Sequence, residues 1–76
     1  MHILDCTDLK CPLPLLKLKV ALASLPKGEL IRLTTTDPVS LRDISAFCEH
    51  MGLHLATHVI GNTYEFVIHE KSTSNT

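Results

Sequence analysis

The sequence has few aromatic side chains, no excess of charge of either sign and no long apolar run. It contains one tyrosine, two phenylalanines and no tryptophan, too few for a base-stacking platform. Seven lysines and arginines against eight aspartates and glutamates leave a net charge of −1, whereas nucleic-acid binders normally have a basic excess. No apolar stretch reaches the roughly 18 residues of a membrane span, and the N-terminus lacks the pattern of an export signal. We therefore expect a cytoplasmic protein that binds neither membranes nor, directly, nucleic acid.

The composition favours a small folded domain. Hydrophobic residues make up 45% of the chain and charged residues 20%, which excludes intrinsic disorder because disorder needs low hydrophobicity and high net charge. A chain of 76 residues has room for one core, so we expect a single domain over residues 1–70. The polar segment 71–76 has no apolar anchors and is predicted to be a disordered tail. Three cysteines are an odd number, so reduced thiols are expected rather than a disulfide framework.

Turn signals and hydrophobic periodicity predict six short elements. They are a strand at 2–5, a helix at 12–25, a strand at 29–35, a helix that begins at 38, and strands at 55–60 and 64–69. Gly61 and Asn62 are expected to join the last two strands as a tight hairpin. The order β-α-β-α-β-β predicts an α+β fold, a two-layer α/β sandwich with two helices packed on one face of a four-stranded mixed sheet.

The second helix has the clearest pattern in the sequence. Asp37 is its expected N-cap, Pro38 occupies the first helical position, and Gly52 is its expected C-terminal cap. Apolar residues at three- and four-residue spacing define a single stripe: Leu41, Ile44, Phe47, Cys48 and Met51. Arg42 and Asp43 lie on the other side, where they are expected to be solvated or to stabilise the helix cap.

The first helix has two apolar stripes, although a helix that lies on a sheet needs only one. One stripe consists of Leu13, Leu16, Val20 and Ala23, and the other of Leu15, Leu18, Leu22 and Leu25. Two interpretations follow. The extra stripe packs against the other helix, which we favour because a small domain needs all the burial it can find. Alternatively, part of it stays exposed as a docking patch for another protein.

The most unusual local sequence lies at the start of the first helix. Cys11 occupies the expected N-cap position, with Pro12 first and Pro14 third in the helix, and Lys10 precedes them. Both prolines are tolerated there because the N–H groups of a first turn have no intrahelical acceptor. The N–H of Leu13 is expected to donate to the sulfur of Cys11. A cysteine is a poor helix cap beside serine or aspartate, so a purely structural capping role is the weaker interpretation.

The electrostatics expected at this helix end favour a thiolate. The helix contributes about half a positive charge at its N-terminus, and Lys10 and Lys17 add positive potential. We therefore expect the pKa of Cys11 to be lowered. A thiol that ionises near ambient pH is also the best compromise between thiolate fraction and nucleophilicity. Cys11 is the candidate reactive residue of the chain.

With these residues in view, the sequence resembles the TusA-like (SirA-like) sulfur-carrier family. The family signature, Cys-Pro-x-Pro at the start of the first helix, is matched by Cys11-Pro12-Leu13-Pro14. The resemblance extends over residues 3–69 and includes Leu9-Lys10, Lys27-Gly28-Glu29, Thr36-Asp37-Pro38, Arg42-Asp43-Ile44 and Phe47-Cys48. One departure is Asp8, where many members have glycine. Aspartate tolerates left-handed backbone better than most residues, so we expect the loop to keep its conformation.

The resemblance implies a specific function. Family members carry sulfur as a persulfide on the motif cysteine, here Cys11. They receive it from a cysteine desulfurase or a rhodanese-like protein and pass it to an acceptor protein, in tRNA thiolation, molybdenum cofactor synthesis or sulfur oxidation. No metal or organic cofactor is required, and a carrier that docks two partners in turn is expected to be monomeric. Leu13, Leu15, Lys10 and Lys17 are candidate partner contacts, although core packing explains the two leucines equally well.

The other two cysteines and the histidines are weaker candidates for a functional site. Cys48 is expected to be a buried structural thiol, and Cys6 a packed residue rather than one that forms a disulfide with Cys11. A metal site is rejected on spacing, since His54 and His58 lie about 13 Å apart along one strand. Two other functional classes remain open. One is a thiol-based redox sensor or regulatory interaction protein, and the other is a small RNA-binding module, against which the neutral charge speaks.

Overall fold

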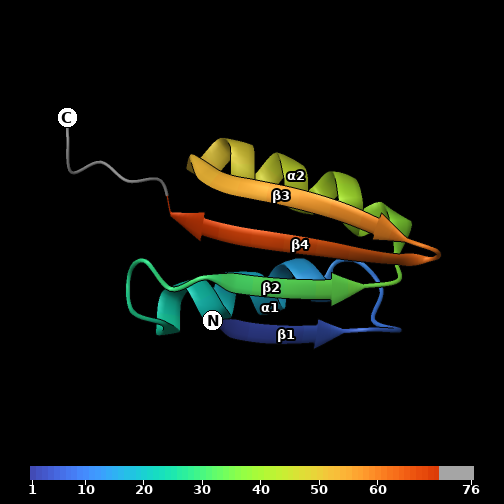
Figure 1. Cartoon of the computed structure of the whole chain (residues 1–76), viewed down its shortest axis with the longest axis horizontal. Coiled ribbons are helices and arrows are strands. Elements are labelled where there is room, and N and C mark those ends of the chain that lie inside the picture. Colours follow the sequence, from blue (N-terminus) through green and yellow to red (C-terminus); the bar gives the residue numbers. More distant parts are fainter. Residues whose placement is uncertain (71–76) are drawn as a thin grey trace.

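The computed structural model describes residues 1–70, and the tail predicted at 71–76 lies outside the described residues. The elements follow the predicted order (Figure 1): β1 (His2–Cys6), α1 (Leu13–Ser24), β2 (Ile31–Thr35), α2 (Pro38–Met51), β3 (Leu53–Ile60) and β4 (Thr63–Glu70). The predicted boundaries differ by one or two residues at most ends, which is the usual uncertainty where helices fray and strands begin. None of the helices within residues 1–70 is long and apolar enough to cross a membrane.

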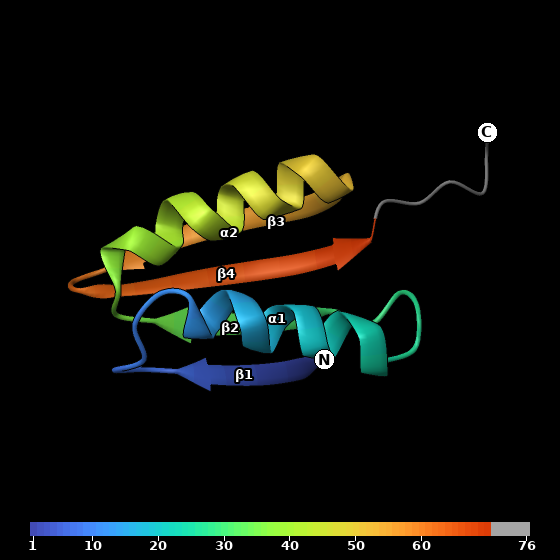
Figure 2. The same ribbon diagram turned by 180° about the vertical axis from the view of Figure 1, so that it is seen from behind.

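The four strands form one mixed sheet in the order β1-β2-β4-β3. β1 and β2 are parallel, joined by α1 as the crossover, and the other two pairings are antiparallel. Both helices lie on the same face of the sheet and begin at the same end of the molecule (Figure 2). The predicted α+β sandwich with two helices on one face of a mixed sheet is therefore confirmed.

The core lies between the helices and the inner face of the sheet. Phe66 and Ile68 of β4 are fully buried, as is Leu33 of β2. The other buried apolar residues come from β1, α1, β2 and α2: Cys6, Leu18, Ala21, Ile31, Ile44 and Cys48. This distribution makes β2 and β4 the central strands, and α1 and α2 cover them.

The second helix has the predicted caps. The Asp37 carboxylate accepts the N–H of Val39 at 3.2 Å, and Gly52 adopts left-handed backbone at φ +72° beyond the last turn. Ile44 and Cys48 of the predicted stripe are buried. Met51 was expected in the same stripe but is 56% exposed, because it lies in the last turn of α2, at the rim of a groove between the helices rather than over the sheet.

The two stripes of α1 have different surroundings. Leu18 is buried, and Leu15, Leu22 and Leu25 pack against the core. The other stripe faces away from the core, with Leu13 and Leu16 nearly half exposed and Val20 66% exposed. The favoured prediction, that the extra stripe packs against the other helix, is wrong. The alternative of an exposed apolar stripe is the one found, because α1 lies over β1 and β2 with its outer face toward solvent.

Candidate functional site

Two loops meet at the edge of the sheet where the helices begin. β1 and β2 are parallel and in register, with Cys6 beside Thr35, so the segments that follow them leave from the same edge (Figure 2). The first segment turns at Asp8, whose φ of +67° is left-handed. The N–H of Asp8 donates to Thr36 Oγ1 at 3.1 Å, which ties the two loops together. The expectation that aspartate tolerates this loop conformation is confirmed.

Cys11 is held by two carboxylates of the second helix. Its N–H donates to Asp37 Oδ2 at 2.6 Å, and its thiol Sγ donates to Asp43 Oδ2. Asp37 thus caps α2 with one carboxylate oxygen and binds the Cys11 backbone with the other. The Cys11 N–H, more than the capping bonds, holds the pKa of Asp37 below its ordinary value. The N-terminus of α2 therefore fixes the position of Cys11.

The start of α1 lies one residue later than predicted. Pro12 is the N-cap and Leu13 the first helical residue, and the Cys11–Pro12 peptide bond is cis. We expected the N–H of Leu13 to donate to the sulfur of Cys11. It donates instead to the carbonyl of Lys10 at 2.8 Å, so that prediction is wrong. Pro14, in the first turn of α1, is buried. The motif therefore shapes the loop before the helix, and Cys11 lies in that loop rather than at the cap.

The pKa of the Cys11 thiol is raised, so the predicted lowering is wrong. The hydrogen bond to the Asp43 carboxylate is the main cause, followed by partial removal from water and by the negative charges of Asp43 and Asp37. Each of these favours the protonated thiol over the thiolate. The N–H of Leu13, the first residue of the helix, donates to the Lys10 carbonyl, and the positive charge of Lys10 lowers the pKa of Asp37. Asp43 is thus a site residue and not the solvated surface charge we had expected.

The other predicted site residues fall into two environments, exposed and partly buried. Lys10, Pro12 and Lys17 are exposed, and Leu13 is 46% exposed. Leu15 packs partly buried against the core, so core packing accounts for it better than partner contact. Lys10 and Pro12 are the neighbours of Cys11 in the loop, and Leu13 and Lys17 lie on the exposed surface of α1.

The three cysteines are free, and only Cys11 is accessible. Cys6 and Cys48 are buried, and burial raises the pKa of both thiols. Cys6 and Cys48 belong to the hydrophobic core, as expected of packed structural thiols. Within residues 1–70, no group of three or more side chains could hold a metal ion.

The spacing argument about histidines missed one pair. His54 and His69 stack with ring centroids 4.8 Å apart, because they are register partners on β3 and β4. Counting outward from the hairpin at Gly61 and Asn62 would have found this pair, whereas we compared His54 with His58 on the same strand. Two imidazoles without a third ligand do not make a metal centre.

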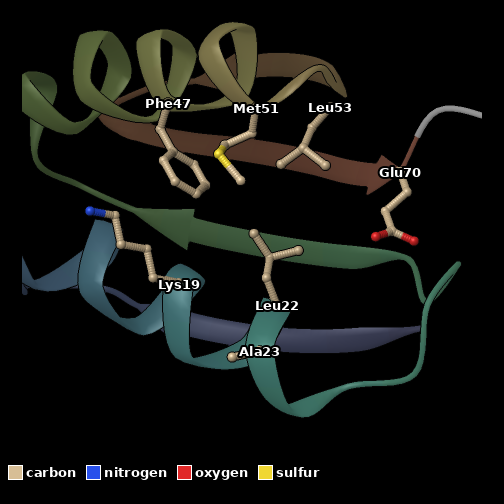
Figure 3. A pocket seen from close by; sticks show the side chains of 7 residues that line it. All are labelled: Lys19, Leu22, Ala23, Phe47, Met51, Leu53 and Glu70. Carbon is tan, nitrogen blue, oxygen red and sulfur yellow. The ribbon is translucent and has the colours of Figure 1, made fainter.

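A shallow groove of about 400 Å³ lies between the C-terminal halves of α1 and α2 (Figure 3). Its lining is apolar, from Leu22, Phe47, Met51 and Leu53, and the ammonium of Lys19 lies 5.5 Å from the centre of the Phe47 ring. The groove is formed by the C-terminal halves of α1 and α2, whereas Cys11 lies before the first turn of α1. It is therefore not part of the thiol site.

The fold agrees with the family comparison. Residues 2–70 match the family model for sulfurtransferase TusA. This match covers nearly the whole chain, and the protein belongs to the TusA family, whose members include sulfur carriers. The expected family is therefore confirmed.

Named relatives and one solved structure agree with this assignment. The sulfur carrier protein TusA of Allochromatium vinosum is 35% identical over 66 residues, 86% of this chain and 87% of its own. That of Pseudomonas syringae is 37% identical, covering 92% of this chain and 84% of its own. A Neisseria meningitidis protein is 45% identical over 49 residues, a match that spans just under two thirds of that protein, 66%. A SirA-like protein from Desulfitobacterium hafniense has the same fold, with a TM-score of 0.80 over 90% of this chain and 95% of its own, at 24% identity.

Proposed function

We propose that the protein is a sulfur carrier that holds sulfane sulfur as a persulfide on Cys11. The observation that carries the proposal is the accessibility of this thiol. Cys11 is half-buried and free, while Cys6 and Cys48 are buried in the core. A carrier must present its sulfur to two partner proteins in turn, and a buried thiol is inert in that chemistry. Family membership supports the same role.

The transfer needs only the cysteine and a donor. Cys11 loses its proton and attacks the outer sulfur of a donor persulfide. A new S–S bond forms, the donor's S–S bond breaks, and the donor's inner sulfur leaves as a thiolate that takes up the proton. The persulfide on Cys11 then gives its outer sulfur to an acceptor in the same way. We expect the donor to be a cysteine desulfurase or a rhodanese-like protein, and the acceptor to act in a pathway such as tRNA thiolation.

The partners are proposed to dock on the surface beside Cys11. Leu13 and Leu16 expose nearly half of their surface along the outer stripe of α1, and Val20 exposes 66%. Val39, at the start of α2, is 46% exposed. Leu13, Leu16 and Val20 share one face of α1, so they form an exposed apolar stripe that begins beside the loop holding Cys11. Lys10 and Lys17 are exposed as well.

Sulfur loading can be tested by mass spectrometry. Reduced protein is exposed to a sulfane-sulfur donor, and the intact mass and peptide map are compared with those of Cys11→Ser. We expect one added sulfur atom on Cys11 and no addition in the variant. Cys48→Ala is the matched control, because it removes a buried thiol and should leave loading unchanged. If Cys11 reacts with an alkylating agent but takes up no sulfur, the carrier proposal fails and a redox-sensing role becomes the better explanation.

A further inference from the structure

Two carboxylates act on the sulfur of Cys11. Asp43 accepts the thiol hydrogen bond from the side of α2, and Asp37 adds its negative charge from the cap of the same helix. The positive charge of the neighbouring Lys10 lowers the pKa of Asp37. A site built to keep a thiolate would place donors or cations against the sulfur. This site presents an acceptor instead.

We propose that Asp43 is a positioning residue, which holds uncharged Cys11 inward as a thiol and turns the sulfur outward once Cys11 carries a persulfide. The proposal rests on the proposed carrier function. A carboxylate accepts hydrogen bonds and cannot donate them, so it stabilises the thiol that donates to it. A persulfide is a stronger acid than the parent thiol and is ionised at neutral pH, so it has no proton to donate. The same carboxylate then repels it.

The geometry allows this change to occur at the side chain alone. The backbone of Cys11 is fixed by its 2.6 Å hydrogen bond to Asp37, and its loop is tied to Thr36 through Asp8. Repulsion from Asp43 is therefore relieved by rotation about the Cα–Cβ bond of Cys11 rather than by movement of the loop. Sulfur loading thus changes the direction of the Cys11 side chain, from α2 toward solvent and the docking surface.

Loading also balances in protons. Cys11 gives up its thiol proton to water, and its sulfur attacks the outer sulfur of the donor persulfide. One S–S bond forms and one breaks, and the donor leaves as a thiolate. That thiolate takes up a proton from water. Sulfane sulfur is transferred without net oxidation, so no external oxidant or reductant is needed.

The first test is the titration of the empty carrier. The alkylation rate of Cys11, followed by peptide mapping, is measured against pH for wild type, Asp43→Asn and Glu49→Gln. Asparagine can still accept from the thiol but carries no charge, so we expect alkylation near pH 7 to rise several-fold. Glu49→Gln removes the same charge from α2 six residues further on and should leave the profile unchanged. An unchanged profile in Asp43→Asn overturns the inference.

A second variant guards against a loss of folding. Asp43→Glu keeps the charge, and its profile should lie nearer to wild type than that of Asp43→Asn, with all three variants compared at matched helical circular dichroism. If Asp43→Glu behaves as Asp43→Asn does, the charge is not the cause and the inference fails. This titration uses no sulfur donor, so it is independent of the test of the carrier function.

The loaded state is tested by nuclear magnetic resonance of side-chain carboxyl carbons. On conversion of Cys11 to the persulfide, the Asp43 signal should move because its hydrogen bond is lost, while the Glu49 signal stays in place. An Asp43 signal that is unchanged in fully loaded protein would contradict the outward turn. Failure to load at all would instead count against the proposed function.

Discussion

Asp8 places an L-residue in the left-handed region, at φ +67°, in the turn between β1 and the thiol loop. Left-handed backbone costs an L-residue roughly 1–2 kcal/mol, and less for aspartate. Its N–H, and not its carboxylate, makes the contact with Thr36, and glycine keeps that group. Asp8→Gly is therefore expected to raise the free energy of unfolding by up to about 1 kcal/mol, measured by urea denaturation.

The matched control at this position is Asp8→Val, because a β-branched residue tolerates positive φ worst. It should lower the free energy of unfolding. If Asp8→Gly lowers stability as well, the aspartate side chain must stabilise the loop by a contact of its own.

The chemistry of Cys11 was only half predictable from the sequence. The motif identified the accessible thiol, but its environment depends on a hydrogen bond between residues 32 positions apart. Charges near in sequence, Lys10 and Lys17, suggested a thiolate. The charges near in space, Asp43 and Asp37, favour the thiol. In the sequence, the one sign of a functional role for Asp43 is that its segment resembles the family. The residues next to Asp43 do not show in which direction its side chain points.

The two helices differ in how completely a local pattern defines them. In α2 the cap at Asp37, the single apolar stripe and Gly52 agree with one another, and the structure follows them except at Met51, which is exposed. In α1 both stripes are apolar, and periodicity alone does not choose the buried one. Leu18 is buried because β1 and β2 lie against its side of α1. The sequence of α1 does not show where those strands lie.

Opposite faces of α1 are expected to respond differently to substitution. Leu18 is fully buried, so Leu18→Ala should cost about 2–5 kcal/mol of unfolding free energy. Leu16 on the outer stripe is 47% exposed, so Leu16→Gln should change stability by no more than about 0.5 kcal/mol. Urea denaturation separates these outcomes.

The same Leu16→Gln variant tests the docking surface. Loading by a small sulfane-sulfur compound should match wild type, whereas loading by a partner protein should be slower. A variant that unfolds readily, or that is slowed equally with both donors, would show that Leu16 serves the fold rather than docking.

At the scale of the whole molecule, the element order was enough to predict the layers but not the strand order. The runs at 55–60 and 64–69 are similarly apolar in sequence, so either could have paired with β2. In the fold β4 is central because Phe66 and Ile68 are fully buried under the helices, while residues 56–60 of β3 are exposed at the sheet edge. The difference arises from how much of each strand the helices cover, and this is a property of the assembled sandwich.

The distribution of ionisable groups predicts a stability plateau with a loss at each end of the pH scale. The Cys11 N–H lowers the pKa of Asp37 and the Thr7 hydroxyl lowers that of Asp5. A carboxyl whose pKa is lower in the folded state stabilises the fold above its unfolded value of 3.8, and this contribution is lost as pH falls through the folded pKa. The acid limb therefore lies below about pH 3.8.

The alkaline limb arises from the three thiols. Asp43 raises the pKa of Cys11, and burial raises that of Cys6 and Cys48. A thiol that ionises less readily in the folded state contributes its full stability below the unfolded value of 9.0 and loses it as pH rises through the folded pKa. Urea denaturation under reducing conditions should therefore give a free energy of unfolding that falls above about pH 9. Cys48→Ala should flatten that fall, because a core position without a thiol has no proton to lose. An alkaline limb of the same steepness in Cys48→Ala would mean that the buried thiol does not contribute to it.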